Sequence, residues 1–330
     1  MGIKIAYYSV RKVISNSDRL AESGSEAERI KDKGFIGLYL DRCPLLRLNI
    51  FPKPVFEQKH PLNQPYMTKN PLKVFHPVHV DGLKRLGNNY DGGYVIHYSS
   101  LHDADYIVNY GVGYNVAFEK DFFSETGKPT LAFDPTLKEL APIFKKLIAG
   151  QLIPFLRHLK NRIVWVSREK TLKSSGITFV EEGIADKDSA QYKSLAYHFK
   201  KYGLTDKKII LKIDVEGAEY PVFNDPATYP LLSNAIQILL EFHELSSHMP
   251  ELEKIMNRLS ETHSLIHIHA NNHGGNFTYQ GKSIPDAIEA TFLHNKYLPK
   301  KEYSTAAYPV PGLDQPCDKR KKDEILDFFY

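Results

Sequence analysis

Acidic and histidine side chains gather at the ends of three apolar segments in the second half of the chain. The pairs are Asp214 and Glu216 in KIILKIDVE, Glu241 and His243 in LLEFHEL, and His267 and His269 in IHIHANN. Residues two apart lie on the same face of a β-strand, so each pair shares a face. If the three segments are successive strands, we expect all three pairs to converge at one edge of a sheet.

This group of side chains allows three interpretations. In the first, His243 or His269 is a general base helped by a carboxylate, because imidazole titrates near neutral pH. In the second, Asp214, Glu241 and His243 bind a divalent cation such as Mg²⁺ or Mn²⁺. In the third, the histidines only pair with backbone groups in a polar cleft. We predict His243 as the base, with Asp214, Glu216, Glu241 and His269 orienting it, the acceptor or a metal.

A glycine-rich turn follows an apolar segment earlier in the chain. Residues 105–110 run into Gly111-Val-Gly113 and then into a segment with helical character. Glycine allows a tight turn and a close ligand approach, and the following helix offers free N–H groups. The pattern predicts a cofactor loop, although a plain strand-to-helix turn would have the same sequence.

Asp134 ends the next apolar segment, LAFD, about 20 residues after the glycines, where such folds hold a ribose diol. A carboxylate there can accept hydrogen bonds from both hydroxyls. The alternative is an N-cap for the following helix, a role that Thr136 could also fill.

Short apolar runs alternate with amphipathic stretches from about residue 74, which favours βα units and a mainly parallel sheet. The expected strands are 105–110, 130–133, 177–180, 208–214, 236–242, 264–269 and 287–293. The expected helices are 115–127, 137–148, 188–202, 218–223 and 250–261. No helix is expected between the last two strands, so they should pair antiparallel. The predicted fold class is α/β, with a seven-stranded, mostly parallel sheet whose last strand is antiparallel.

The chain divides by composition into three parts. Residues 1–73 should form a helical extension with a proline-rich connector, 74–300 the cofactor-binding domain, and 301–330 a C-terminal tail. The tail is charged and then ends in LDFFY, so it is either loosely ordered or docked by its aromatic end. The lead segment could contact a second subunit, which allows a homodimer.

The composition of the chain limits the kinds of partner that we expect. With 43 lysines and arginines against 39 acidic residues, the formal charge is only +4, too mild to indicate nucleic-acid binding but compatible with an anionic substrate. The two cysteines lie far apart, so no disulfide framework is expected. We find no signal peptide and no apolar stretch of about 18 residues that could span a membrane, so a cytoplasmic protein is expected.

Four motifs together resemble the FkbM-type methyltransferases. They are RLGNNYDGGYVI, NYGVGYNVAFEKDF, FDPT and DVEGAE, in that order over about residues 80–295. The resemblance implies a class I methyltransferase fold of the Rossmann-like type and S-adenosylmethionine as the cofactor.

The resemblance also implies roles for individual residues. Gly111 and Gly113 would cradle the methionine part of the cofactor, and Asp134 would hold its ribose. Glu182 or Asp186 would flank the adenine.

A lid or anchor beside the cofactor is implied for a segment upstream of the glycine turn. Its members are Arg85, Asp91, Gly92, Gly93 and Tyr94. Asp91-Gly-Gly also fits an ordinary turn into the strand YVIHY, and the spacing of Arg85 and Asp91 permits a charge pair.

The predicted reaction is O-methylation of a sugar hydroxyl, in a surface polysaccharide or in a nucleotide-linked or phosphorylated precursor. Residues 271–275 (NNHGG) form a polar turn that could contact such an acceptor. A polyketide-like acceptor is one alternative. Another is a nicotinamide-dependent oxidoreductase, although the loop lacks the third glycine of that fingerprint. A binding module that has kept the fold is a third.

Overall fold

The computed structural model describes residues 71–137, 159–160 and 172–330. All of them belong to one compact unit, Tyr66–Tyr330. Nearly all of the predicted N-terminal extension, Cys43 and nearly all of the helix expected at 137–148 lie outside the described residues. None of the described helices is long and apolar enough to cross a membrane.

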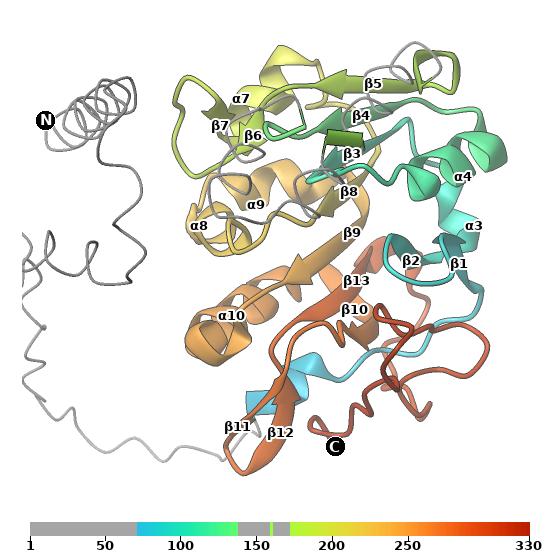
Figure 1. Ribbon diagram of the computed structural model, residues 1–330, viewed down its shortest axis with the longest axis vertical. Helices are drawn as coiled ribbons and strands as arrows, with labels where there is room; N and C mark the ends of the chain where they lie inside the picture. The colour runs from blue at the N-terminus through green and yellow to red at the C-terminus, as the bar shows by residue number, and fades with distance from the viewer. Residues whose placement is uncertain (1–70, 138–158, 161–171) are drawn as a thin grey trace, which may run out of the picture. The chain divides into compact units, whose positions relative to one another are not determined.

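Seven strands form the central sheet (Figure 1). In spatial order they are β10 (His263–Ala270), β13 (Ile288–His294), β9 (Ala235–Phe242), β8 (Ile209–Ile213), β3 (Tyr106–Tyr110), β4 (Thr130–Phe133) and β5 (Ile177–Val180). Only β13 runs antiparallel, and it does so to both of its neighbours. This order and this single reversal are those of the Rossmann-like methyltransferases, so the predicted fold class and all seven strands are confirmed.

Consecutive residues of the central strands point to opposite faces of the sheet, and helices cover both faces. Val108 and Leu211 pack in the larger core cluster with α7 (Leu195–Lys201), α8 (Glu219–Asn224) and α10 (Leu245–Leu259). The residues that precede them, Ile107 and Ile210, pack on the other face against α4 (Ala117–Thr126) and a hairpin. The outcome is a three-layered domain with the sheet in the middle.

The remaining elements are short. They are α3 (Tyr98–Leu101), α9 (Thr228–Leu231), the hairpins β1 (Leu83–Gly87)–β2 (Gly93–His97) and β11 (Asn276–Tyr279)–β12 (Lys282–Pro285), the pair β6 (Gly183–Ile184)–β7 (Tyr192–Lys193), and 3₁₀ turns at Pro71–Phe75, Leu232–Asn234 and Asn295–Tyr297.

Two helices differ from the sequence prediction. Helix α10 begins at Leu245 rather than at residue 250, because Pro250 is accommodated inside the helix. Helix α7 is shorter than the predicted 188–202, because the residues before it form a turn and the strand β7.

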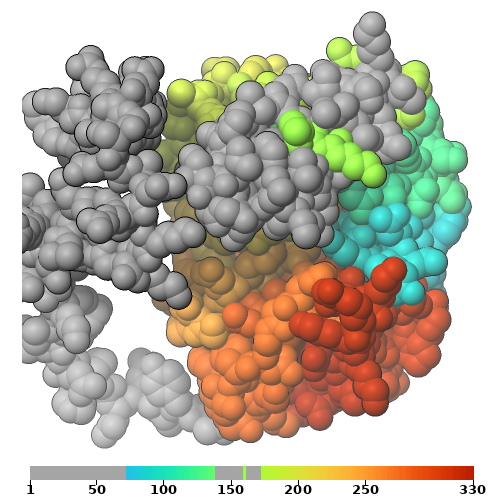
Figure 2. Space-filling model, viewed as in Figure 1, coloured from blue at the N-terminus to red at the C-terminus, as the bar shows by residue number. Residues whose placement is uncertain are grey.

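The C-terminal tail is docked, which settles the choice between its two predicted states. Phe328 and Phe329 are buried, and Phe328 packs edge-on against Phe75. Tyr308 and Leu326 form a bridge that joins the two halves of the tail. Figure 2 shows the red C-terminal residues packed over the orange ones that precede them in the chain.

Candidate active site

A cavity of about 740 Å³ lies at the carboxyl ends of β3, β4, β8 and β9. Its lining residues include the glycine turn after β3, polar side chains at the ends of β8 and β9, and the turn after β10. Ligands of open α/β sheets bind at this edge. The sequence prediction of a polar edge beside a cofactor loop therefore holds for β3, β8 and β9.

The glycine turn is packed tightly against the loop that follows β8. Gly111 has φ +79°, and a Cβ atom on it would lie 1.6 Å from the carbonyl oxygen of Asp214. Gly113 also has a positive φ, +57°, but has open space around it. Only glycine satisfies both demands at position 111, so the two loops that carry the chemistry are fixed to each other through their backbones.

Asp134 lines the cavity and fixes the turn at the same time. Its Oδ2 accepts a hydrogen bond of 2.9 Å from the backbone N–H of Gly113. Its Oδ1 accepts bonds from the N–H and the hydroxyl of Thr136, at 2.8 and 2.7 Å. Asp134 therefore fixes the turn at residues 134–136, and nearly all of the helix that it was predicted to cap lies outside the described residues. Since a carboxylate has about four acceptor positions, Asp134 keeps capacity for a ligand hydroxyl.

Asn109 and Glu119 line the cavity beside the glycine turn, and the sequence analysis did not select them. Both are 1% exposed, and the Asn109 amide donates to Glu119 Oε1. Asn109 Oδ1 and Glu119 Oε2 are buried without a hydrogen-bond partner. Burial raises the pKa of Glu119. Each of these two oxygens can accept a hydrogen bond from a ligand or a water in the cavity. The only signal in the sequence was their closeness to the glycines.

The polar side chains after β8 and β9 meet around the imidazole of His243. Its Nε2 lies 3.4 Å from Glu241 Oε1, 3.9 Å from Asp214 Oδ1 and 3.8 Å from Glu216 Oε2. Its Nδ1 lies 2.9 Å from Glu219 Oε1. Four of the predicted catalytic residues are therefore brought together, and Glu219 is added to them. We call Asp214, Glu241 and His243 the cavity cluster.

The surroundings of the cavity cluster fix its members. Tyr94 Oη donates to Asp214 Oδ2 at 3.0 Å, and the Lys212 ammonium lies 3.3 Å from the same oxygen. The Asn271 amide donates to Glu241. In Asp214, Oδ2 is hydrogen-bonded and Oδ1 lies near His243. In Glu241 one oxygen, Oε1, both accepts from Asn271 and lies near His243.

The electrostatics of the cavity cluster favour a charged His243. Burial lowers the pKa of His243, but hydrogen bonds to Glu219 and Glu241 outweigh it and raise the pKa to about 11. Burial and the charge of Asp214 raise the pKa of Glu241 to about 7. The assignment of His243 as the general base stays a prediction.

The segment predicted as a lid or anchor divides in two. Asp91, Gly92 and Tyr94 line the cavity, whereas Arg85 and Gly93 do not. The Arg85 guanidinium donates to the carbonyl oxygens of Asn88 and Tyr90 at 3.0 and 2.9 Å, which holds the turn between β1 and β2.

Glycine is required at both positions of this turn. A Cβ atom on Gly93 would lie 1.9 Å from the carbonyl oxygen of Asn88, and one on Gly92 would lie 1.9 Å from the Asn115 amide. Arg85 and Gly93 therefore shape the wall without facing the ligand.

Glu182 and Asp186 do not line the cavity. Glu182 pairs with the Lys201 ammonium at 2.9 Å and with His198 Nε2 at 3.3 Å. Gly183 and Ile184, the next two residues, line the cavity in its place. Gly183 and Ile184 form β6, which pairs with β7, and Tyr192 of β7 also lines the cavity.

His267 and His269 do not reach the cavity. The antiparallel strand β13 is inserted between β9 and β10, so the third polar pair lies two strands away from His243. His267 Nε2 pairs with Asp314 of the tail at 3.1 Å. His269 Nδ1 lies 3.0 Å from Glu289, and its Nε2 lies 3.0 Å from Asp323.

The strand order, the glycine turn and the acidic residue after β4 define the architecture of a class I methyltransferase. Residues 165–297 match the family described as the methyltransferase FkbM domain, which confirms the resemblance and identifies a methyltransferase domain. The matched part contains DVEGAE and the histidine-bearing strands. The glycine turn and Asp134 precede it.

Among solved structures, the chain is similar to an rRNA methylase from Streptococcus thermophilus, at 10% identity and TM-score 0.32 over 59% of this chain and 90% of that one. It is also similar to a precorrin-6y methyltransferase from Geobacter metallireducens GS-15, at 12% identity and TM-score 0.29 over 59% and 83% of the two chains. No curated protein matches the sequence.

Proposed function

We propose that this methyltransferase uses S-adenosylmethionine to methylate a hydroxyl of a neutral, sugar-like acceptor. One observation carries the proposal: Asp214 belongs to both halves of the cavity. Its carbonyl oxygen touches Gly111 of the cofactor loop, and its carboxylate lies in the cavity cluster. A methyl donor on the loop would therefore lie beside groups that can bind a hydroxyl and take up its proton.

The residues present fit the cofactor. The unpartnered oxygens of Asn109 and Glu119 suit an ammonium group, such as that of a methionine moiety. Asp134 can accept from a ribose hydroxyl, and Ile184 gives an apolar surface for a base. The bound cofactor would supply an activated methyl group on a sulfonium. The role of the protein is to align the acceptor with it, and alignment contributes much of the rate.

The cavity cluster suits a divalent cation better than a lone general base. Carboxylate oxygens of Asp214 and Glu241 and the Nε2 of His243 lie close enough to share one ion. His243 Nδ1 can donate to Glu219, which would leave the Nε2 lone pair directed at the ion, as is common for metal-binding histidines. Mg²⁺ or Mn²⁺ would bind the acceptor hydroxyl and ease loss of its proton.

The charges around the cavity support a neutral acceptor rather than the phosphorylated form considered from the sequence. The acidic side chains that line it are Asp91, Glu119, Asp134, Asp214, Glu216, Glu241, Glu244 and Asp286, whereas the basic ones are Lys212, His243 and His273. A phosphate would meet net repulsion here. Asn271, His273 and Asp286 offer donors and acceptors for several hydroxyls.

Thermal melting with S-adenosylhomocysteine tests the cofactor. Ligand at about 100 times its dissociation constant should add roughly 2.7 kcal/mol of stability. We expect a shift with this ligand, none with NAD, and a reduced shift in Asp134→Ala. Stabilisation by NAD alone would replace the proposal with the oxidoreductase alternative.

Methyl transfer to a panel of neutral and phosphorylated sugars tests the acceptor and the cation. We expect activity on neutral sugars that chelation removes and Mg²⁺ or Mn²⁺ restores. Full activity after chelation would exclude the cation, and a preference for phosphorylated sugars would overturn the acceptor class.

A further inference from the structure

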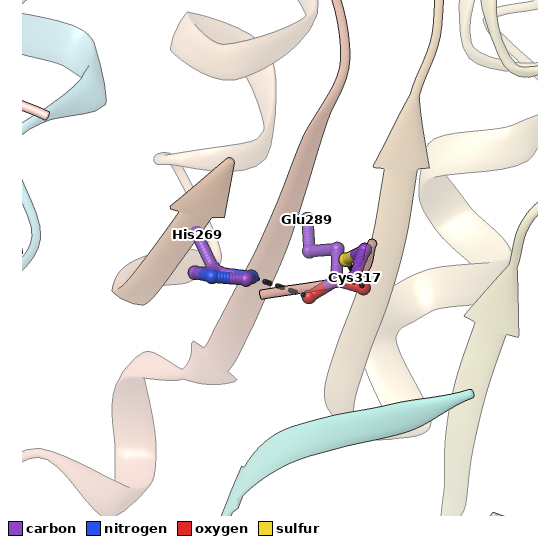
Figure 3. A group of neighbouring side chains, drawn as sticks. All are labelled: His269, Glu289 and Cys317. Carbon is purple, nitrogen blue, oxygen red and sulfur yellow. Dashed lines mark hydrogen bonds and ion pairs between the residues drawn. The ribbon is translucent and has the colours of Figure 1, made fainter. Parts of the chain in front are cut away.

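A second cluster of metal-ligand side chains lies outside the cavity. His269 on β10, Glu289 on β13 and Cys317 in the tail point toward one another (Figure 3). All three residues are buried, at 1, 8 and 4% exposure. We call them the tail cluster. The proposed methyl transfer uses none of them.

The geometry of the tail cluster brings three donor atoms to one point. His269 and Glu289 are directly paired across neighbouring strands. Glu289 Oε2 lies 3.0 Å from His269 Nδ1, and Glu289 Oε1 lies 3.6 Å from Cys317 Sγ. One ligand atom from each residue lies within 4.8 Å of the others. The two oxygens of Glu289 face the other two residues, so Glu289 can contribute both oxygens. The site then has four donor atoms.

A second carboxylate orients the imidazole. His269 Nε2, the ring nitrogen turned away from the cluster, lies 3.0 and 3.1 Å from the two oxygens of Asp323. Metal-binding histidines almost always donate their other N–H to such a partner, which fixes the tautomer with a lone pair on the metal side. Asp323 therefore does for His269 what Glu219 does for His243.

We propose that His269, Glu289 and Cys317 form a structural site for Zn²⁺. Nitrogen, oxygen and sulfur donors together are the ligand set of zinc, which binds them at about 2.0–2.3 Å. A thiolate disfavours Mg²⁺ and Ca²⁺, which prefer oxygen ligands. Binding requires a neutral His269 and a Cys317 thiolate, so the ion displaces the protons that these groups carry.

The site would hold the tail to the edge of the cavity. Cys317 and Asp323 flank a tail segment whose Asp318 N–H donates to Asn272 Oδ1 at 2.6 Å. Lys321 Nζ donates to the Asn272 carbonyl oxygen at 2.8 Å. Asn272 lies in the turn after β10 whose neighbours Asn271 and His273 line the cavity. A zinc ion under the tail would therefore stabilise that wall.

The tail cluster differs in chemistry from the cavity cluster, so the two proposals can be tested apart. Only the tail cluster contains sulfur, and it is the more buried of the two. The experiment uses the full chain, stripped of metal and reloaded with Co²⁺, a spectroscopic substitute for zinc. A cobalt–thiolate bond gives a charge-transfer band in the near ultraviolet. The readout does not depend on methyl transfer.

We expect wild-type protein to bind one Co²⁺ with a thiolate band that one equivalent of Zn²⁺ removes. The band should be absent in Cys317→Ser and retained in Cys43→Ser, the matched control, and in Asp214→Asn. Zinc should raise the melting temperature of wild type more than that of Cys317→Ser.

Two outcomes would overturn the proposal. One is wild-type protein that binds Co²⁺ without a thiolate band. The other is a band that persists in Cys317→Ser. Because the wild-type spectrum alone is decisive, the test stands even if a variant fails to fold. In either case the tail cluster would be a hydrogen-bonded group of protein side chains, with His269 bridging Glu289 and Asp323.

Discussion

The cavity cluster and the tail cluster are built from one row of side chains across the sheet. Glu241 on β9 is paired directly with Glu289 on β13, and Glu289 with His269 on β10. The row continues on the cavity side to His243, which lies 3.4 Å from Glu241. Neighbouring positions in the same sheet thus supply two sites of similar composition.

The two clusters differ in how far other parts of the chain cover them. The cavity cluster opens to a volume of about 740 Å³, and the Glu216 side chain beside it is 87% exposed. The tail lies over the other cluster and contributes Cys317 and Asp323 to it. An open carboxylate–imidazole group can meet a substrate, whereas a covered one can only hold the structure together. In our proposals, burial more than residue type separates the catalytic cluster from the structural one.

The largest expected effect is on turnover by His243→Ala. Removing the imidazole takes away the predicted general base or metal ligand of the cavity cluster, which should lower kcat by about 10²–10⁴-fold. Glu219 keeps its bonds from the N–H groups of Val215 and Gly217, so cofactor affinity should change little. Single-turnover kinetics and calorimetry measure both, with the exposed His79→Ala as control. Unchanged turnover would remove His243 from the reaction.

His269→Ala should show the opposite pattern. It leaves the buried carboxylate of Glu289 and the half-buried one of Asp323 without their shared partner, which should cost about 3–5 kcal/mol of unfolding free energy. Turnover per folded molecule should fall less than in His243→Ala. Urea unfolding followed by activity at low urea measures this. A stable but inactive variant would contradict the structural role.

Glu119→Gln compares two parts of the cavity: the part proposed to hold the cofactor and the part that holds the cavity cluster. Loss of a charged hydrogen-bond partner should weaken S-adenosylhomocysteine binding by about 1.5–3 kcal/mol, roughly ten- to a hundredfold. Binding of 5′-methylthioadenosine, which lacks the amino-acid part, should not change. Calorimetry with both ligands decides. Equal losses would assign Glu119 to folding rather than to the ammonium.

The smallest expected effect is on the pH dependence of stability, through His263 at the start of β10. Burial lowers the pKa of His263 to about 4. Its ring nitrogens lie beside the Ala235 carbonyl oxygen and the Thr262 hydroxyl, and not beside carboxylates that would favour the charged form. The unfolded chain binds this proton near pH 6.5, so His263 contributes stability that is lost as pH falls from about 6.5 to 4.

His263→Gln should therefore remove part of the acid sensitivity. Wild type should lose roughly 1–2 kcal/mol at pH 5 relative to pH 7.5 through this group, and the variant should not. Urea midpoints at the two pH values measure the difference. Equal acid losses in both proteins would show that His263 is not a buried neutral group.

The elements of the sheet and the position of the cavity could be predicted from the sequence. Alternating apolar runs give strands of period two, and Gly111 and DVEGAE mark where two of them end. Because parallel strands present their carboxyl ends at one edge, Asp214, Glu241 and His243 could be assigned to a common site from local pattern alone.

Which of these polar residues line the cavity and which lie under the tail depended on tertiary structure. The insertion of β13 between β9 and β10 moved His269 away from His243, and no local periodicity encodes the spatial order of strands. Cys317 and Asp323 reach His269 from 48 and 54 residues further along the chain. Such contacts arise from chain topology and burial. The sequence could therefore place histidines on strand faces, but only the folded chain decided which of them meet a cavity and which are covered.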